Sequence, residues 1–228
     1  MNQRIVSDLR DCYFENLRDF EFLLMYRGVP FIAKTRLVNV SEQEATFEVQ
    51  SPEGVLFELG RPAVLLRDEL GDPVKCRIVS FDLASRNLVM GEFDYSTEQI
   101  GKRAEYRVEP LPPLEAIILA AGKEIPGFLV DLSPSGAGVV VAVYDAGEHC
   151  PVGAEVVLRM TLSESPVTLP SVVRYTECRG NDLRLALVFA ANAPHKNSVM
   201  RYVIRQQMEI RAEVEKMYQS RMGGVGEV

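Results

Sequence analysis

The sequence lacks any apolar run long enough to span a bilayer, and its first twenty residues mix charges throughout, without an apolar segment. A membrane-spanning helix needs about 20 mainly apolar residues, and a secretory signal needs an apolar core of about 7–15. We therefore expect a cytoplasmic protein without membrane insertion.

Histidines and paired cysteines are also scarce. Neither His149 nor His195 lies in a recognisable catalytic motif, and no two of the four cysteines form a CxxC pair. In a chain without an export signal, such scattered cysteines are expected to stay reduced. His149 and Cys150 are adjacent, but no second pair follows at a spacing typical of zinc sites. We therefore predict no metal site, no cofactor and no enzymatic activity.

Excess positive charge is absent as well. The 228 residues carry a formal net charge of −7 at pH 7, and 47% of them are hydrophobic. This composition supports a sizeable core, but it gives no general affinity for nucleic acid or for an anionic membrane. An anionic ligand would have to be bound by a local cluster of basic residues.

The first part of the chain predicts a helix followed by strands. Apolar residues recur at near-helical spacing between about Ile5 and Leu24, which indicates a short amphipathic helix. Alternating and β-rich runs follow from Val29 to Phe93, separated by turn residues, and one of them is Gly54–Leu59. Many short strands with regular turns are typical of a barrel or sandwich.

The second part repeats this character without a visible sequence repeat. The polar stretch 94–107 is interpreted as a linker, β-rich runs continue to Phe189, and a helix is expected to begin near Pro194. The chain is thus predicted to be mainly β, with two β-barrel-like domains at residues 1–98 and 99–228. The second domain would end in a C-terminal α-helix.

Two arginines form the first motif that suggests chemistry. Arg103 and Arg107 make an RxxxR pattern, and Lys102 immediately precedes it. A guanidinium group matches phosphate oxygens or the O6/N7 edge of guanine, and its face can stack on a purine. Because two surface arginines are commonly a solvated face, this motif gains meaning only beside a second one.

The second motif is DxSxxG, formed by Asp131, Ser133 and Gly136 at the end of a predicted strand. A carboxylate can accept hydrogen bonds from N1–H and N2–H₂ of guanine, and serine adds a small donor and acceptor. Gly136 is able to take positive φ and lets the backbone approach a bulky ligand. Alone, the pattern is also typical of an Asx or ST turn. Together, the two motifs suit a guanine nucleotide that carries phosphate.

RxxxR followed by DxSxxG on the early strands of a small barrel resembles the PilZ domain, over about Gln99 to Gln219. The resemblance implies a six-stranded barrel with a C-terminal helix that binds the second messenger cyclic di-GMP. It implies the following ligand-binding residues: Lys102, Arg103, Arg107, Asp131, Ser133 and Gly136. In the family, the residue before the first arginine influences whether one or two nucleotides bind, and Lys102 is at that position here. A glycine often found before the phenylalanine of the last strand is absent, with Ala186 in that region.

The layout of the first domain resembles the N-terminal domain of flagellar-brake (YcgR-like) proteins. This resemblance implies a receptor that changes its interdomain arrangement on binding the nucleotide and signals to a protein partner, with flagellar motor components as candidates. The alternative is a PilZ adaptor that binds proteins only. The stripe Val203, Ile210 and Met217 on the last helix is consistent with a monomer or a homodimer.

Overall fold

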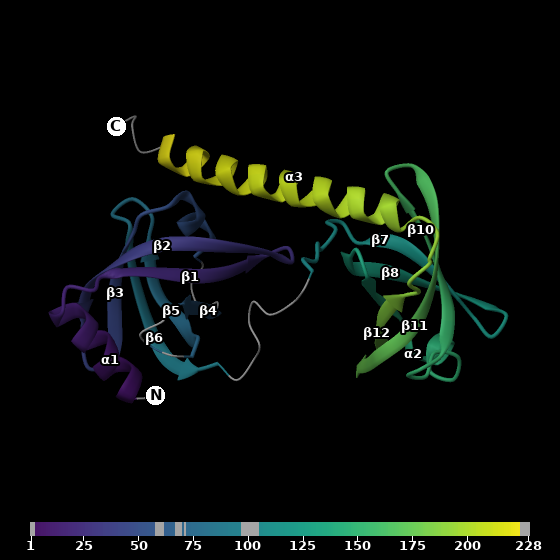
Figure 1. Ribbon diagram of the computed structural model, residues 1–228, viewed down its shortest axis with the longest axis horizontal. Helices are drawn as coiled ribbons and strands as arrows, with labels where there is room; N and C mark the ends of the chain where they lie inside the picture. Colours follow the sequence, from purple (N-terminus) through teal and green to yellow (C-terminus); the bar gives the residue numbers. More distant parts are fainter. Residues whose placement is uncertain (1–2, 58–61, 67–69, 71, 97–104, 224–228) are drawn as a thin grey trace. The chain divides into compact units, whose positions relative to one another are not determined.

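The chain forms two compact units, each with its own β-barrel (Figure 1). The computed structural model describes residues 3–57, 62–66, 70, 72–96 and 105–223. The first unit comprises residues 1–26, 30–103 and 211–228, and the second comprises residues 27–29 and 104–210.

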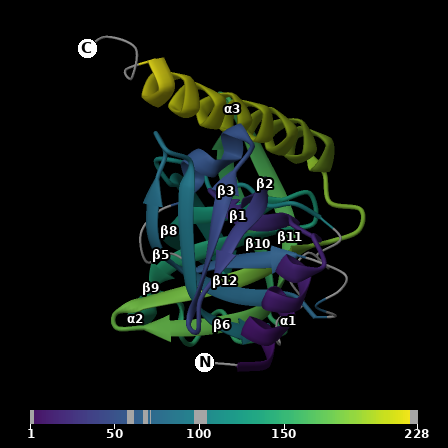
Figure 2. The same ribbon diagram turned by 90° about the vertical axis from the view of Figure 1, so that its left-hand side faces the viewer.

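The first unit is a closed antiparallel barrel in the strand order β1-β2-β3-β6-β5-β4. Its elements are α1 (Gln3–Phe14), β1 (Asp19–Tyr26), β2 (Val29–Val40), β3 (Glu44–Val49), η1 (Pro52–Leu56), β4 (Pro62–Leu66), β5 (Val74–Asp82) and β6 (Asn87–Tyr95). Helix α1 packs on β3 and β6 (Figure 2). It does so through one apolar face, formed by Ile5, Val6, Leu9 and Cys12.

Aromatic side chains fill the first barrel. Phe47 is fully buried and meets Phe20 and Phe22 edge-to-face, with ring centroids 5.6 and 5.1 Å apart. Phe57 continues the cluster from Phe22 to Phe81. Edge-to-face pairs of this kind add stability beyond the area that they bury.

The second unit is also a closed antiparallel barrel, in the order β10-β11-β12-β9-β8-β7. Its elements are β7 (Leu114–Ala120), β8 (Lys123–Ser133), β9 (Gly136–Ala142), α2 (Val143–Ala146), β10 (Glu155–Leu162), β11 (Ser165–Arg179) and β12 (Asp182–Phe189). Its core is mostly aliphatic and includes Ile118, Leu129, Val139, Leu158 and Leu185. The predicted mainly β fold with two barrels is confirmed.

A long helix, α3 (Lys196–Gly223), ends the described chain. The predicted C-terminal helix is therefore confirmed. It buries Val199, Val203, Ile210 and Val214, while Met217 is half-buried. Of the helices in the described residues, none is both long and apolar enough to cross a membrane.

Two predicted elements of the first unit differ from the structure, the helix in its extent and one strand in its type. The helix expected over Ile5–Leu24 ends at Phe14, because Asn16 has a left-handed backbone (φ 60°) that breaks it, and β1 begins at Asp19. The strand expected over Gly54–Leu59 begins as the short 3₁₀ helix η1, with a proline in its first turn. Both segments carry apolar residues that suit either kind of element.

Candidate functional site

A bulge in β8 turns Asp131 outward. Leu129 pairs with Val139 and Asp131 pairs with Gly138, so Val130 is an extra residue on β8. Leu129 and Leu132 are both fully buried in the core. Since side chains in a regular strand alternate, this spacing of three places both intervening side chains on the outer face of the barrel.

Two arginines hold the carboxylate of Asp131. Arg107 Nη1 lies 3.0 Å from Oδ1, and Arg184 Nη2 lies 2.6 Å from Oδ2. The Asp131 side chain is only 7% exposed, whereas those of the arginines are 41% and 42% exposed. A buried carboxylate is costly unless it is paired and hydrogen-bonded. The cluster of these three residues carries a net single positive charge and is partly open to solvent.

Backbone pairing brings Arg107 to this place. The amide of Val108 donates to the carbonyl of Leu132, and the amide of Leu132 donates to the carbonyl of Val108, both at 2.9 Å. Arg107 and Asp131, which precede these two residues along the chain, lie diagonally across the antiparallel bridge on one face, within reach of the long arginine side chain. The structure therefore joins the second arginine of RxxxR to the aspartate of DxSxxG. Lys102 and Arg103 lie outside the described residues.

A row of small residues leads away from Asp131 across the sheet. Asp131 pairs with Gly138, Gly138 with Ala186, and Ala186 with Tyr175. A second bulge, in β11 between Val173 and Tyr175, marks the far end of the row, and Tyr175 is 57% exposed. This row on the outer face thus has a carboxylate at one end, a glycine and an alanine in the middle, and an aromatic ring at the other end.

Gly138 is required by close packing. A Cβ atom at this position would lie 2.2 Å from Asp131 Oδ2. No real Cβ contact is that short, so any other residue would displace the carboxylate. Gly138 therefore belongs to the site, although its backbone needs no unusual conformation.

Ser133 and Gly136 close the turn between β8 and β9. The Ser133 hydroxyl donates to the Gly136 carbonyl at 3.2 Å. The expectation that Gly136 takes positive φ is not met, since it is absent from the positive-φ residues. Instead, a Cβ on Gly136 would lie 2.4 Å from the Leu187 carbonyl oxygen, so glycine permits the close approach of β12. Contact of Ser133 and Gly136 with a ligand stays a prediction.

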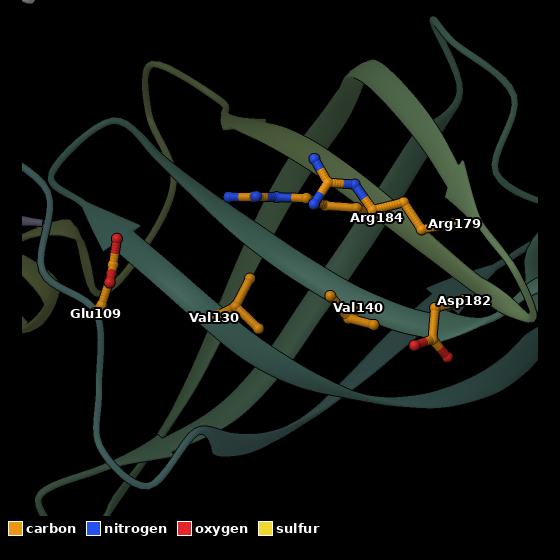
Figure 3. A pocket seen from close by; sticks show the side chains of 6 residues that line it. All are labelled: Glu109, Val130, Val140, Arg179, Asp182 and Arg184. Atoms are coloured by element: carbon orange, nitrogen blue, oxygen red, sulfur yellow. The ribbon is translucent and has the colours of Figure 1, made fainter. Parts of the chain in front are cut away.

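A pocket of about 330 Å³ opens beside the cluster (Figure 3). It is lined by Glu109, Val130, Val140, Arg179, Asp182 and Arg184. Figure 3 shows Glu109 at one end and Asp182 at the other, with the two valines between them. Arg184 both lines this pocket and binds Asp131, so the pocket adjoins the ion pair. Its apolar floor and charged rim suit a flat polar ring.

Sequence reasoning missed Arg184 and Gly138. Both lie beyond the two motifs, on β12 and β9, and only the strand register brings them to Asp131. The alternation of Arg184 with buried Leu183 and Leu185 marks it as outward-facing, but this signal does not identify its partner.

The predicted absence of a metal site concerns His149 and Cys150. His149 Nε2 lies 2.9 Å from Lys123 Nζ, and Cys150 is buried, which raises the pKa of its thiol. Within the described part of the chain, no group of three or more His, Cys, Asp or Glu side chains is arranged to hold a metal ion.

Comparison with known proteins places the second unit in a family. Residues 101–205 match the model of the PilZ domain. No curated protein matches the chain.

Several solved structures are similar over most of their length. The inhibitor of motility MotI/DgrA from Bacillus subtilis is 16% identical, with 84% of this chain and 96% of that chain covered and a TM-score of 0.43. YcgR from Escherichia coli in complex with c-di-GMP is 16% identical, with 93% of each chain covered and a TM-score of 0.44. The K. pneumonia MrkH–c-di-GMP complex is 12% identical, with 95% and 96% covered and a TM-score of 0.45.

Proposed function

We propose that this chain, in which residues 101–205 form a PilZ domain, is a receptor for cyclic di-GMP. The observation that supports this most directly is Asp131, a nearly buried carboxylate that faces an open row of small residues and is flanked by Arg107 and Arg184. The PilZ family is a family of non-enzymatic receptors, and we assign no reaction to the chain.

The Asp131 carboxylate covers Gly138, and in the proposed complex one guanine lies over Ala186 with its Watson–Crick edge toward Asp131. An ionised carboxylate has about four acceptor positions. Each oxygen of Asp131 can therefore keep its arginine and still accept N1–H or N2–H₂ of the base. The open row leaves room for the ring, and the exposed ring of Tyr175 offers an aromatic surface at its far end.

The phosphates are assigned to the basic segment before the barrel. Arg107 is placed beside Asp131 by the pairing of Val108 with Leu132. Arg103 and Lys102 precede it in the sequence, and we propose that they complete the clamp around the two negative phosphates. Ser133 and Gly136 are proposed to line the guanine side of the ligand.

The output is proposed to be a change in the arrangement of the domains 1–98 and 99–228. The RxxxR motif lies close to the boundary between them in the sequence, so binding of the nucleotide by these arginines would restrain that segment. The ligand shifts such an equilibrium only by its differential affinity for the two arrangements. The altered surface would then bind a protein partner, and flagellar motor components are the first candidates to test.

Calorimetric titration with cyclic di-GMP, with GTP as the control ligand, tests the receptor proposal. We expect saturable binding with a dissociation constant in the micromolar range or below, no response to GTP, and loss of binding in the double variant Arg103→Ala/Arg107→Ala. A ligand at about 100 times its dissociation constant should stabilise the fold by about 2.7 kcal/mol. If neither heat nor a thermal shift appears at about 100 μM cyclic di-GMP, the chain is an adaptor that binds proteins only.

A further inference from the structure

Arg184 reaches Asp131 from a strand that is not its neighbour. Asp131 is on β8 and Arg184 is on β12, and β9 lies between these two strands in the sheet. The guanidinium nonetheless lies 2.6 Å from Asp131 Oδ2. Arg184 itself pairs with Val140 on β9, and a Cβ at the neighbouring outward position, Gly138, would lie 2.2 Å from that same oxygen. The absence of a side chain at Gly138 and the ion pair with Arg184 therefore both affect the same atom, Asp131 Oδ2.

The other arginine on Asp131 has a second task. Arg107 holds Oδ1, but it also belongs to the RxxxR motif, which is proposed to bind phosphate. If Arg107 turns toward the ligand, the Asp131 side chain, which is 7% exposed, loses that partner. A carboxylate so nearly buried needs a remaining hydrogen-bonded cation to stay in place. Arg184 is positioned to provide it.

Arg184 also fixes the direction in which Asp131 points. Its contact at Oδ2 comes from the β12 side, along the same outer face as the row of Gly138 and Ala186. With Oδ2 held there, both oxygens lie toward that row and each retains lone pairs for a base. Recognition of guanine through two donors requires both oxygens at once, which a freely rotating carboxylate would present only part of the time.

We propose that Arg184 is a positioning residue for guanine recognition, and that Gly138 leaves the space in which Asp131 Oδ2 lies. This inference rests on the proposed function as a cyclic di-GMP receptor. It assigns to a residue outside both sequence motifs the selectivity for a base with a 2-amino group.

The test compares two ligands that differ only at that group. Cyclic di-GMP and its inosine analogue, cyclic di-IMP, which lacks both 2-amino groups, are titrated into the full-length wild type and into Arg184→Gln. We expect the wild type to prefer cyclic di-GMP by about 10-fold or more, as a paired hydrogen-bond contact with a base typically provides. In Arg184→Gln, we expect this preference to fall to about 3-fold or less, with cyclic di-GMP affected more than cyclic di-IMP.

Matched variants separate positioning from a general loss of structure. Arg184→Lys returns a cation and an N–H donor, and should restore part of the preference because the contact uses one nitrogen of Arg184. Arg159 is 40% exposed, like Arg184, and pairs with Glu124 in the same barrel, so Arg159→Gln should change neither affinity. Gly138→Ala should reduce the preference with Arg184 intact, since its Cβ displaces Oδ2.

Each outcome decides the matter. Wild-type binding with an unchanged preference in Arg184→Gln overturns the positioning role and leaves the receptor proposal standing. An equal loss of affinity for both ligands also overturns it, because that result indicates a phosphate contact or a structural role. If the wild type binds neither ligand, the receptor proposal and this inference both fail.

Discussion

The two barrels share one topology but differ in what their outer faces present. Taken in chain order, the six strands of each barrel are joined into the same ring, so that β2, β3, β6 and β5 correspond to β8, β9, β12 and β11. The bulges correspond as well. Val38 in β2 occupies the place of Val130, and the irregularity before Ser80 in β5 matches the one before Tyr175 in β11.

The row that carries the site therefore has a counterpart in the first barrel. There, Asn39 pairs with Thr46, Thr46 with Val89, and Val89 with Ser80. Where the second barrel has an acid, glycine, alanine and tyrosine, this row has an amide, two branched side chains and a serine.

This difference shows that neither the barrel nor its bulges make a binding site. The bulge turns a side chain outward in both units, but only the second unit leaves the neighbouring positions bare and supplies a carboxylate. The cores differ in a complementary way. The first is rich in phenylalanine, and the second is mostly aliphatic and has a buried carboxylate at its edge. The proposed function therefore depends on a few outward positions that the shared architecture leaves free.

The largest effect expected is on the stability of the first barrel. Phe47→Ala removes a fully buried ring that contacts two others, and should lower the free energy of unfolding by about 3–5 kcal/mol. Because this core belongs to the first unit alone, the affinity for cyclic di-GMP should stay within about 3-fold of the wild type, a change of less than 1 kcal/mol. Chemical denaturation and calorimetry measure the two quantities, and a joint loss would show that the units do not act separately.

Exchanging the middle residues of the two rows gives the next effect. Gly138→Thr introduces the residue of the first barrel, whose Cβ would collide with Asp131 Oδ2, and should weaken cyclic di-GMP binding by about 100-fold or more. The reverse change, Thr46→Gly, should leave the affinity unchanged. The free energy of unfolding of Thr46→Gly should be about 0.5–1 kcal/mol lower than that of Thr46→Ala. Equal affinities for the two variants would remove Gly138 from the site.

The smallest effect expected comes from exchanging the first residues of the rows. Asp131→Asn keeps the shape but loses the charge that binds two arginines, and should lower the free energy of unfolding by about 1.5–3 kcal/mol. Asn39→Asp, at an exposed position of the first barrel, should change it by less than about 0.5 kcal/mol. Urea denaturation of both variants compares them, and similar values would mean that the ion pairs contribute nothing to folding.

Much of this organisation could be predicted from the sequence. The alternating runs and turn residues indicated two barrels, and the spacing of DxSxxG identified Asp131 before its surroundings were known. The register of the strands could not be predicted, because the local sequence does not indicate that Asp131 pairs with Gly138 or that Arg184 reaches across β9. The strand order that the two barrels share could not be predicted from the sequence either, because equivalent positions such as Thr46 and Gly138 carry unlike residues.

The absence of a side chain at Gly138 would also make the proposed response to cyclic di-GMP easy to lose. Every single-base change that replaces a glycine codon by that of another amino acid adds at least a Cβ atom, and here that atom would meet the Asp131 carboxylate. The surrounding strands and core would not be altered by that change, so the chain could keep its barrel while losing the proposed binding of the nucleotide. In the proposed receptor, one mutational step at Gly138 would therefore separate a form that responds to the nucleotide from a form that does not.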